Sequence, residues 1–529
     1  MSLRGRTVRA GLLATLGTLV AACTLVPPSE SPPAEPTPIR ASADASPSET
    51  PSPTATPSPT PDPEVEVPLA VVTGYTAATA SITLEEVRAA ADTIRVPCGV
   101  RSYLDRAVVD GGDCLDAAEI ADLLNAAPQD QPLLALLPPS MVTPDVKVLP
   151  VDGADLFGGP EARAADYPVT GTAIGAEPYD PDEIRTLMSL GDSCPDRGVA
   201  YAAITLGRGW DWVFGGGTAE YTAVYPNPVP AGYVGNGFNI VDAVRTDNEG
   251  AVAALVSGAD VTLDDFECPV VDNWRVNDGV VFSIDPAVLP RLRDTYGVDV
   301  ATLAANHLFD QGVDGFLETL DKFEAAGIPT AGAGTNLDDA LEPALVDVNG
   351  LTFGFVGFNE IPPAYAEATP DSPGVLWLRD ENVIEAAARA RTEGADVVVC
   401  VPQWWGGAEY HAEFRGDMRR QQQVFFDAGC DQVVGHGTHW SGPIEITPDE
   451  DGAYHVTMVS HGNFLFGQEW SQQTQEGVTL ELSFRGTDLV QARMHPYIML
   501  DQAQTNLTDP ATDGLYVLNR IYEASGLLP

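Results

Sequence analysis

Short apolar runs alternate with amphipathic stretches through the second half of the chain. The apolar runs favour strands, whereas the stretches between them repeat hydrophobic residues at helical spacing. The predicted strands are 199–206, 299–303, 353–358, 396–401, 432–434 and 455–459. The predicted helices are 251–257, 315–326, 381–392 and 415–428. This alternation predicts a layered α/β domain whose functional side chains gather on the loops that follow the strands.

The first part of the chain has a different pattern. A strand is predicted at 67–73, a helix at 83–92 and an apolar segment at 133–137. Short phrases such as "SITLEEVRAAADTI" resemble parts of a periplasmic solute-binding domain. The roughly 460 residues beyond the N-terminal segment exceed one typical core, so we expect a smaller α/β domain at 67–195 and a larger domain at 196–529. Because residues 67–195 contain no histidine, a binding or spacer role is favoured there over catalysis.

The N-terminus has the features of an export signal. Three arginines precede an apolar run at 11–22, which is too short to span a bilayer and is typical of a signal peptide. The run ends at Cys23 in a pattern that resembles the bacterial lipobox, so we expect 1–23 to be a lipoprotein signal with Cys23 lipidated. The alternative is an ordinary signal cut near Ala22. Residues 24–66 are rich in Pro, Ser and Thr and predict a disordered stalk, which would hold the protein at the outer face of the membrane.

The charge of the chain restricts its partners. The net charge is −49, the pI is about 4.1, and Lys147 and Lys322 are the only lysines. Nucleic acid is therefore excluded as a partner, because no basic stripe exists to neutralise phosphates. An anionic polymer would also be repelled unless a metal ion or a local arginine cluster intervenes. The acidity has a simpler explanation too, namely adaptation of the surface to a salty or high-GC host.

The cysteines predict disulfides. Apart from Cys23 there are six, an even number without the CxxC spacing of a metal site. Cys98 and Cys114 are the natural local pair, and a bond between Cys400 and Cys430 would tie two adjacent strands. The sequence alone does not fix the pairing.

Candidate chemistry follows the strands. All seven histidines lie between residues 307 and 495, and Asn306-His307, the loop with His436 and His439, and His461 each come just after a predicted strand. Asp265 and Glu267 lie on a further loop. Carboxylate, amide and imidazole groups on separate loops are the ligand types of a metallohydrolase, in which a divalent metal activates water. His455 and His495 are better explained as hydrogen-bonded structural residues, and His411 fits either role.

Seven motifs in order give a more specific indication. They are "WDWVFGG" from Trp210, "DFECP" from Asp265, "ANHLFDQG" from Ala305, "GIPTAGAG" from Gly327, "PQWWGGAEY" from Pro402, "GHGTHW" from Gly435 and "SHGNFLF" from Ser460. Together they resemble the CapA family of bacterial capsule (poly-γ-glutamate) synthesis proteins, in the calcineurin-like metallophosphatase superfamily. The resemblance covers about residues 196–490 and implies a four-layer α/β/β/α sandwich.

The resemblance also implies roles for single residues. Asp211 would be the first acidic metal ligand, Glu267 the carboxylate that bridges two metals, and Asn306 the amide ligand. His439 would be the last histidine ligand, and His307 would protonate the leaving group. We set aside the Gly191-Asp192 pair, which fits the family's strand-then-Gly-Asp motif, because it follows a stretch that looks helical.

The chain departs from the family pattern at several positions. Gln403 or Trp404 replaces one family histidine, and Gly437 replaces another. One metal position is therefore expected to be intact and the second impaired, which implies one bound divalent metal rather than two. Gln403, His436 and His461 are candidate substitute ligands.

Three functional hypotheses remain open. The first is a surface-anchored protein that retains or cleaves an anionic polymer, with poly-γ-glutamate implied by the family, through metal-dependent hydrolysis or transfer at an amide or phosphoester bond. The second is a non-catalytic polymer- or solute-binding lipoprotein with a degenerate metal site. The third, a plain phosphoesterase, is the least favoured because the two histidines are missing.

Overall fold

The computed structural model describes residues 64–100, 114–163, 167–174, 178–226, 239–404 and 409–528. Residues 62–529 form one compact unit, which is the part considered below. The predicted signal peptide, Cys23 and residues 24–63 of the predicted stalk lie outside the described residues. The stalk boundary at residue 66 is too late, because strand β1 (Glu64–Pro68) already pairs with β7 (Thr170–Ile174).

A mixed eight-stranded sheet forms the centre of the larger part. The strand order is β13-β12-β11-β8-β23-β24-β25, and β22 also pairs with β8. The strands are β8 (Ile184–Cys194), β11 (Val261–Phe266), β12 (Val300–Thr302), β13 (Thr330–Ala331), β22 (Asn463–Phe466), β23 (Glu476–Arg485), β24 (Asp488–Leu500) and β25 (Gln504–Leu507). Strands β8, β11, β12 and β13 are parallel, so their carboxyl ends lie at one edge of the sheet.

A second sheet packs face to face against the first. Its order is β15-β16-β18-β19-β21-β20. The strands are β15 (Ala344–Val348), β16 (Leu351–Asn359), β18 (Val397–Gln403), β19 (Gln432–Val434), β20 (Ile444–Pro448) and β21 (Tyr454–Met458). The rings of Phe353 and Phe484, one from each sheet, lie 5.5 Å apart within a single apolar core. Burial of this core on both sides explains the nearly continuous apolar runs of the strands.

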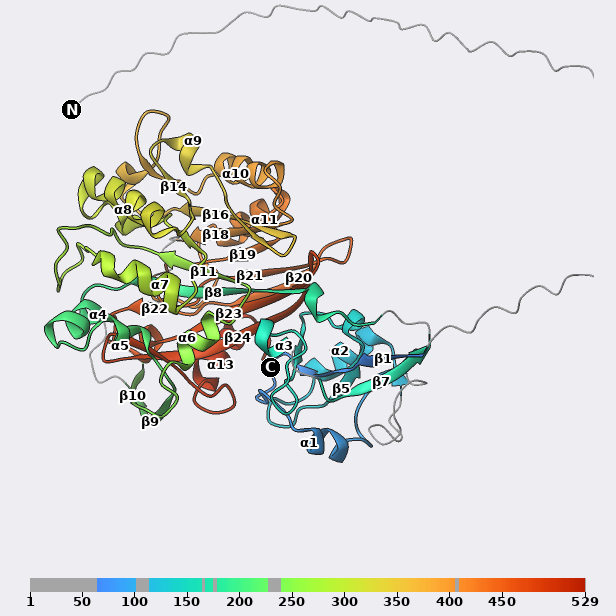
Figure 1. Cartoon of the computed structure of the whole chain (residues 1–529). Coiled ribbons are helices and arrows are strands. Elements are labelled where there is room, and N and C mark those ends of the chain that lie inside the picture. The colour runs from blue at the N-terminus through green and yellow to red at the C-terminus, as the bar shows by residue number, and fades with distance from the viewer. Residues whose placement is uncertain are drawn as a thin grey trace, which may run out of the picture. The chain divides into compact units, whose positions relative to one another are not determined.

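Helices cover the outer faces of the two sheets (Figure 1). On the first sheet lie α5 (Trp210–Phe214), α6 (Ala251–Val256), α7 (Leu289–Thr295) and α8 (Gly312–Ala326), and on the second α10 (Asp380–Thr392) and α11 (Met418–Asp427). Phe323 of α8 packs on Phe266 of β11 at 5.2 Å, and Phe425 of α11 packs on Phe358 of β16 at 5.5 Å. The α/β class expected from the sequence is therefore confirmed.

The N-terminal part has small sheets of its own. Besides the β1–β7 pair it contains β2 (Ala70–Gly74), β5 (Ala135–Leu137) and β6 (Val146–Val148) in one sheet, β3 (Val96–Pro97) with β4 (Cys114–Leu115), and helices α1 (Leu84–Ala89), α2 (Ala117–Asn125) and α3 (Pro160–Arg163). It contacts the large sheet, because the Ser483 hydroxyl donates to the Phe157 carbonyl at 2.7 Å. Its likeness to a solute-binding domain stays a prediction.

Shorter elements complete the described chain. They are α4 (Gly198–Ala200), β9 (Ala219–Pro226), β10 (Asn239–Arg245), β14 (Ala333–Gly334), α9 (Leu337–Ala340), β17 (Gly374–Val375), α12 (Gln472–Gln475) and α13 (Leu515–Ala524), with short 3₁₀ or π turns at Pro139–Met141, Pro181–Glu183, Tyr201–Thr205, Pro286–Val288, Asn306–Phe309 and Ala364–Ala366. Among the residues described, no helix combines the length and hydrophobicity that a membrane crossing requires.

Two local predictions were wrong, and the errors are connected. The predicted strand 199–206 is helical, through α4 and the π turn Tyr201–Thr205. The stretch before Gly191-Asp192, interpreted as helical, is β8, which is buried along its whole length and therefore lacks the alternation that marks a half-exposed strand. Since β8 pairs with β11 and β23, the domain boundary predicted at 195/196 cuts off a central strand of the larger part.

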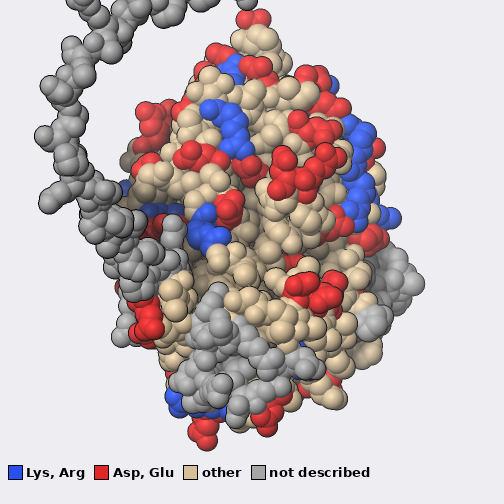
Figure 2. Space-filling view, turned by 90° about the vertical axis from the view of Figure 1, so that its right-hand side faces the viewer, with Lys and Arg blue, Asp and Glu red and all other residues tan. Residues whose placement is uncertain are grey.

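The surface carries the acidic excess in a dispersed form. On the face shown in Figure 2, acidic side chains are spread over the surface with basic ones between them.

Candidate metal centre

The site begins where two parallel strands end. Asp192 lies near the end of β8 and Asp265 near the end of β11, and the two residues are register partners. Glu267 follows β11 directly, and its backbone N–H donates to the Ser193 carbonyl at 2.9 Å. These three side chains are essentially inaccessible to solvent. Strand pairing thus places three carboxylates together in the interior.

Two histidines from the loop after β19 complete the cluster. Nδ1 of His436 lies 3.0 Å from Oδ1 of Asp192, and Nδ1 of His439 lies 3.2 Å from its Oδ2. Two overlapping groups have the spacing of metal ligands: Asp192, Glu267 and His439, and Asp192, Asp265 and His436. Asp192 is shared by both groups, a place that the sequence interpretation gave to Glu267.

The orientation of the His439 ring follows from its neighbours. Asn463 donates through Nδ2 to the Thr474 carbonyl, which can only accept, so its Oδ1 must face the ring. Nδ1 of His439 lies 2.9 Å from that oxygen and is therefore the protonated nitrogen. The lone pair on Nε2 remains as a ligand, which is the usual arrangement of metal-binding histidines.

Burial disfavours the charged form of the carboxyl groups in this cluster, which contains more acids than histidines. It raises the pKa of Asp265 to about 6 and of Asp264, which accepts from the Ser193 hydroxyl, to about 7. The pKa of Glu267 is also well above its ordinary value, first through burial and then through Asp192 and Asp265. Burial also opposes ionisation of Asp192, but hydrogen bonds from His436 and His439 outweigh it and hold that pKa below the usual range. More negative charge is gathered here than the histidines neutralise.

Several polar atoms of the cluster fit a bound cation. Oδ2 of Asp265, Oε1 of Glu267 and Nε2 of His436 are fully buried, and none of them has a hydrogen-bond partner among the described residues. Leaving such atoms unpaired is unfavourable, whereas oxygen and nitrogen donors of this kind coordinate divalent metals. The residues present therefore fit a metal ion on their own chemistry.

The cluster opens into a cavity of 250 Å³ that collects most of the sequence-predicted residues. Its lining includes Glu267, Asn306, His307, Gln403, His439 and Glu409. The end of β18 and the loops after β11, β12, β18 and β19 supply these side chains, as expected for the carboxyl edges of parallel strands. Of the two residues proposed to replace a family histidine, Gln403 lines this cavity, whereas Trp404 is buried against Phe425.

His307 is held in a defined orientation beside this cavity. Its Nδ1 lies 2.9 Å from Oδ2 of Asp310, and its ring packs edge-on against Phe282 at 4.6 Å. The side chain stays partly accessible, so the imidazole can meet a bound molecule. The arrangement is that of a positioned acid–base group.

Asp211 is not part of the site, and its assignment as a metal ligand was wrong. It lies on α5 with 87% of its side chain exposed, and its partner is Arg291 at 3.0 Å. The residue that holds the corresponding position in the cluster is Asp192, which the sequence interpretation rejected. Because β8 was interpreted as a helix, the search for a strand-end aspartate moved along the chain to the wrong residue.

The structure also explains the missing histidine at Gly437. The backbone there has a φ of +90°, and a Cβ atom would lie 2.7 Å from Cγ of Gln403. The loop has therefore no room for a side chain at this position. His436 enters the cluster from the preceding position, while His461 stacks on His436 with ring centroids 4.9 Å apart and belongs to neither ligand group.

A disulfide joins the two strand ends that carry the acids. Cys194, two residues after Asp192, is bonded to Cys268, the residue after Glu267. The structure also contains the two bonds suggested by the sequence, Cys98–Cys114 and Cys400–Cys430. Asp192 and Asp265 are the site residues to which the sequence interpretation gave no metal-binding role. The Gly-Asp pair at 191–192 and the aspartate that opens "DFECP" were the available signals.

The sequence comparison now decides the family. The sequence pattern of "Bacterial capsule synthesis protein PGA_cap" matches residues 186–468, a range that begins within β8 and includes the whole cluster. This chain belongs to the PGA_cap family. The CapA-type resemblance read from the motifs is thereby confirmed.

Two relatives show how far the likeness extends. The PGA biosynthesis protein CapA of Bacillus subtilis is 30% identical over 226 residues, which are 42% of this chain and 57% of the relative. The capsule biosynthesis protein CapA of Bacillus anthracis is 26% identical over 242 residues, 44% of this chain and 57% of the relative. The chain thus spans a little over half the length of these relatives. Among solved structures, the NAD nucleotidase of Haemophilus influenzae is similar at 12% identity and a TM-score of 0.35. The similarity covers 60% of this chain and 56% of the nucleotidase chain. A likeness at that level carries no argument.

Proposed function

We propose that this PGA_cap protein acts on an extracellular anionic polymer at the outer face of the cell membrane, to which lipidation of Cys23 attaches it. Poly-γ-glutamate is the polymer that the family resemblance implies, and one relative is named a PGA biosynthesis protein. The reaction would be metal-dependent cleavage or transfer at an amide or phosphoester bond. The larger part would then be a metallophosphatase-like four-layer sandwich, a reading supported by its two facing sheets with helices outside.

The observation that carries this proposal is the buried group Asp192, Glu267 and His439 at the wall of an open cavity. A cluster buried only for stability would satisfy its carboxylates, whereas this one leaves carboxylate oxygens without a hydrogen-bond partner among the described residues. It also faces a volume that a substrate can enter. Both properties are needed for catalysis and neither is needed for folding.

The residues have distinct proposed roles. Asp192, Glu267 and His439 would hold one metal ion, with Asp265 and His436 as the incomplete second position. A metal held there would supply activated water and neutralise negative charge on the reacting group. His307, oriented by Asp310, would hold the proton that the leaving group receives.

Arg197 gives the site a means to accept an anionic chain. It lines a larger cavity of 590 Å³ next to the cluster, together with His307, His439 and Glu409, and it is the only Lys or Arg among the residues lining that cavity. Its guanidinium lies 4.6 Å from the Phe282 ring centroid, and its Nε donates to the Gly279 carbonyl at 2.8 Å. These contacts fix its place and leave the two terminal amino groups for a carboxylate or phosphate. We expect it to bind the polymer beside the reacting bond.

A binding role without catalysis is the second candidate. The observation in its favour is the loss of two family histidines, at Gln403 and Gly437, because a lone metal cannot hold both the attacking and the leaving oxygens. In this case the cavity and Arg197 would retain the polymer, and the metal would contribute charge only.

The test compares two aspartates that the sequence interpretation confused. Purified protein, Asp192→Asn and Asp211→Asn are loaded with Mn²⁺, dialysed and analysed for metal content. We expect about one metal per chain in the wild type and in Asp211→Asn, and a large loss in Asp192→Asn. Equal metal content in all three would refute the site, and two tightly bound metals would refute the impaired second position.

Activity separates the two candidate functions. The same proteins, with His439→Ala and Arg197→Met, are incubated with poly-γ-glutamate, and chain length is followed by gel filtration. If the wild type shortens the polymer and His439→Ala does not, the hydrolase is supported. Binding without shortening, weakened by Arg197→Met, supports the retention role.

A further inference from the structure

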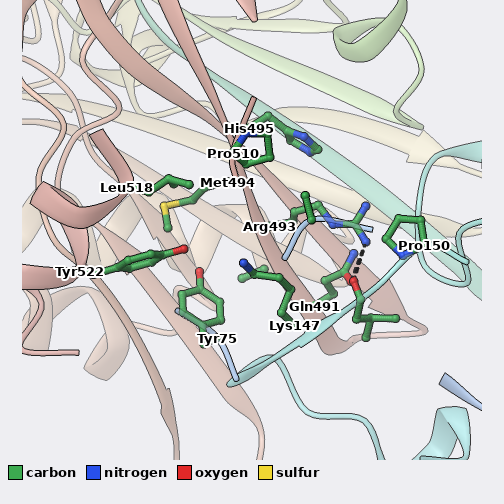
Figure 3. Close-up of a pocket in the computed structure, with 13 residues that line it drawn as sticks. Tyr75, Lys147, Pro150, Gln491, Arg493, Met494, His495, Pro510, Leu518 and Tyr522 are labelled. Atoms are coloured by element: carbon green, nitrogen blue, oxygen red, sulfur yellow. Dashed lines mark hydrogen bonds between the residues drawn. The ribbon is translucent and has the colours of Figure 1, made fainter. Parts of the chain in front are cut away.

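A third cavity lies between the N-terminal part and the large sheet, apart from the metal centre. It has a volume of 190 Å³, and its walls come from β24, α13 and the N-terminal part (Figure 3). The lining residues are Tyr75, Ala80, Lys147, Val148, Pro150, Gln491, Ala492, Arg493, Met494, His495, Pro510, Leu518 and Tyr522. None of them belongs to the candidate metal centre or its two cavities.

One wall of this cavity carries an amine with spare hydrogen-bond donors. Nζ of Lys147 donates to the Ala77 carbonyl, and no carboxylate of the described residues lies within 4.0 Å of it. Burial, with the nearby Arg493 charge, lowers the pKa of Lys147 to about 8, so at neutral pH most of the amine is still protonated. A half-buried ammonium is stabilised by an anionic partner, and this one has only a carbonyl.

The other charged groups of the wall are already satisfied. Arg493 binds Asp155 through both carboxylate oxygens and also contacts Glu481 at 3.8 Å. His495 lies 2.7 Å from Glu481 through Nε2. Both nearby acids are therefore engaged by Arg493 or His495, which leaves Lys147 without an acidic partner among the described residues.

A hydroxyl group completes the polar corner. Oη of Tyr75 is buried without a hydrogen-bond partner among the described residues. Its ring packs edge-on against Tyr522 with centroids 6.0 Å apart. In Figure 3 the Lys147 amine and the two tyrosine hydroxyls point toward one shared space, with Met494 and Leu518 beside it.

We propose that this cavity binds a small monocarboxylate with a compact apolar body. The carboxylate would accept hydrogen bonds from Nζ of Lys147 and Oη of Tyr75, and the body would pack against Met494 and Leu518. The cavity holds the volume of roughly six water molecules, which limits the ligand to a single ring or a short branched chain. The site is independent of the proposed polymer chemistry.

The wall chemistry selects against other ligands. A cation is excluded by Lys147 and Arg493. A phosphate dianion would need more than one uncommitted cation, and inorganic anions would leave the surfaces of Met494, Leu518 and Pro510 without a partner. A monoanion with an apolar body matches both the single free charge and the walls.

Titration calorimetry with benzoate tests the proposal on the full chain. We expect saturable binding that weakens about tenfold or more in Lys147→Met and severalfold in Tyr75→Phe, in line with the loss of charged and neutral hydrogen bonds. Benzamide, with the same shape but no charge, should bind at least about tenfold more weakly than benzoate. The matched control is Lys322→Met, since Lys322 is the other lysine of the chain and lies on the surface beside Asp272. Absence of benzoate binding, equal affinity of Lys147→Met, or phosphate binding as tight as benzoate would overturn the proposal.

A labelling experiment on unmutated protein avoids any effect of substitution on folding. The chain is treated with a limiting amount of an acetylating reagent, with and without benzoate, and the lysine-containing peptides are quantified by mass spectrometry. Benzoate should protect Lys147 severalfold and leave Lys322 unchanged. Equal protection of both lysines, or none, would contradict the site.

Discussion

Two buried clusters of charge lie in this protein, and they are built on opposite principles. Around Arg493 both acids are paired: Asp155 and Glu481 are contacted by Arg493 and His495. Around Asp192 the carboxylates outnumber the histidines, and single oxygens of Asp265 and Glu267 have no hydrogen-bond partner among the described residues. The paired cluster lies where the N-terminal part meets the large sheet, and the unpaired cluster borders an open cavity. Charges left without a partner, in the metal cluster and at Lys147, therefore mark a site better than burial does.

The largest expected effect comes from unbalancing the paired cluster. Arg493→Met leaves Asp155 and Glu481 buried without their cation, so we expect a loss of about 3–5 kcal/mol in the free energy of unfolding, measured with urea. Arg419→Met is the control, because Arg419 is 57% exposed and pairs with Glu445 at the surface, where at most about 1 kcal/mol is at stake. Similar losses in the two variants would contradict the distinction.

Binding of a cation to the unpaired cluster should change the free energy of unfolding by a similar amount, but as a gain. Mn²⁺ at about 100 times its dissociation constant should raise the free energy of unfolding of the wild type by about 2.7 kcal/mol. Asp192→Asn should gain little, while Asp211→Asn should gain as much as the wild type. A gain that survives in Asp192→Asn would place the cation elsewhere.

Lys147 should make the stability of the folded chain depend on pH. Its pKa in the folded chain, about 8, lies below the ordinary value of 10.5, so between these values the unfolded chain binds more protons. Stability should therefore rise with pH across this window, by about 2–3 kcal/mol from this residue. Urea unfolding at a series of pH values should show the rise in the wild type and in Lys322→Met, and lose it in Lys147→Met.

The smallest effect is expected at the residue that the sequence interpretation chose wrongly. Asp211→Asn removes one partner of an exposed pair with Arg291, so the free energy of unfolding should change by no more than about 0.5 kcal/mol. Thermal unfolding with and without Mn²⁺ checks this. A large loss of stability would mean that Asp211 has a role that its exposure hides.

Periodicity predicted much of the second sheet and its helices. The segments 353–358, 396–401 and 432–434 lie in or overlap β16, β18 and β19, and 381–392 lies within α10. These segments are bounded by clear turn residues and match their local propensities. The pattern failed at β8, where eleven successive buried residues give no alternation and the mixture of Leu, Met and Arg is equally suited to a helix.

That single failure moved the predicted site. The strand-end aspartate was sought after 199–206, a segment whose Val, Tyr and Ile suggest a strand but whose tertiary contacts make it helical. Glu267, Asn306, His307 and His439 were found because their loops carry motifs with fixed spacing. The contribution of Asp265 and His436 depends on which strands are neighbours, and sequence order does not reveal that.

The Cys194–Cys268 bond links the geometry of the site to the redox conditions under which the chain folds. Because it joins the ends of β8 and β11, the carboxylates of Asp192 and Glu267 are held together by a covalent tie as well as by the sheet. Such a tie forms only where thiols are oxidised. A chain kept in a reducing environment would thus assemble its metal pocket without this restraint. Maturation of the pocket is therefore coupled to the compartment in which the chain folds.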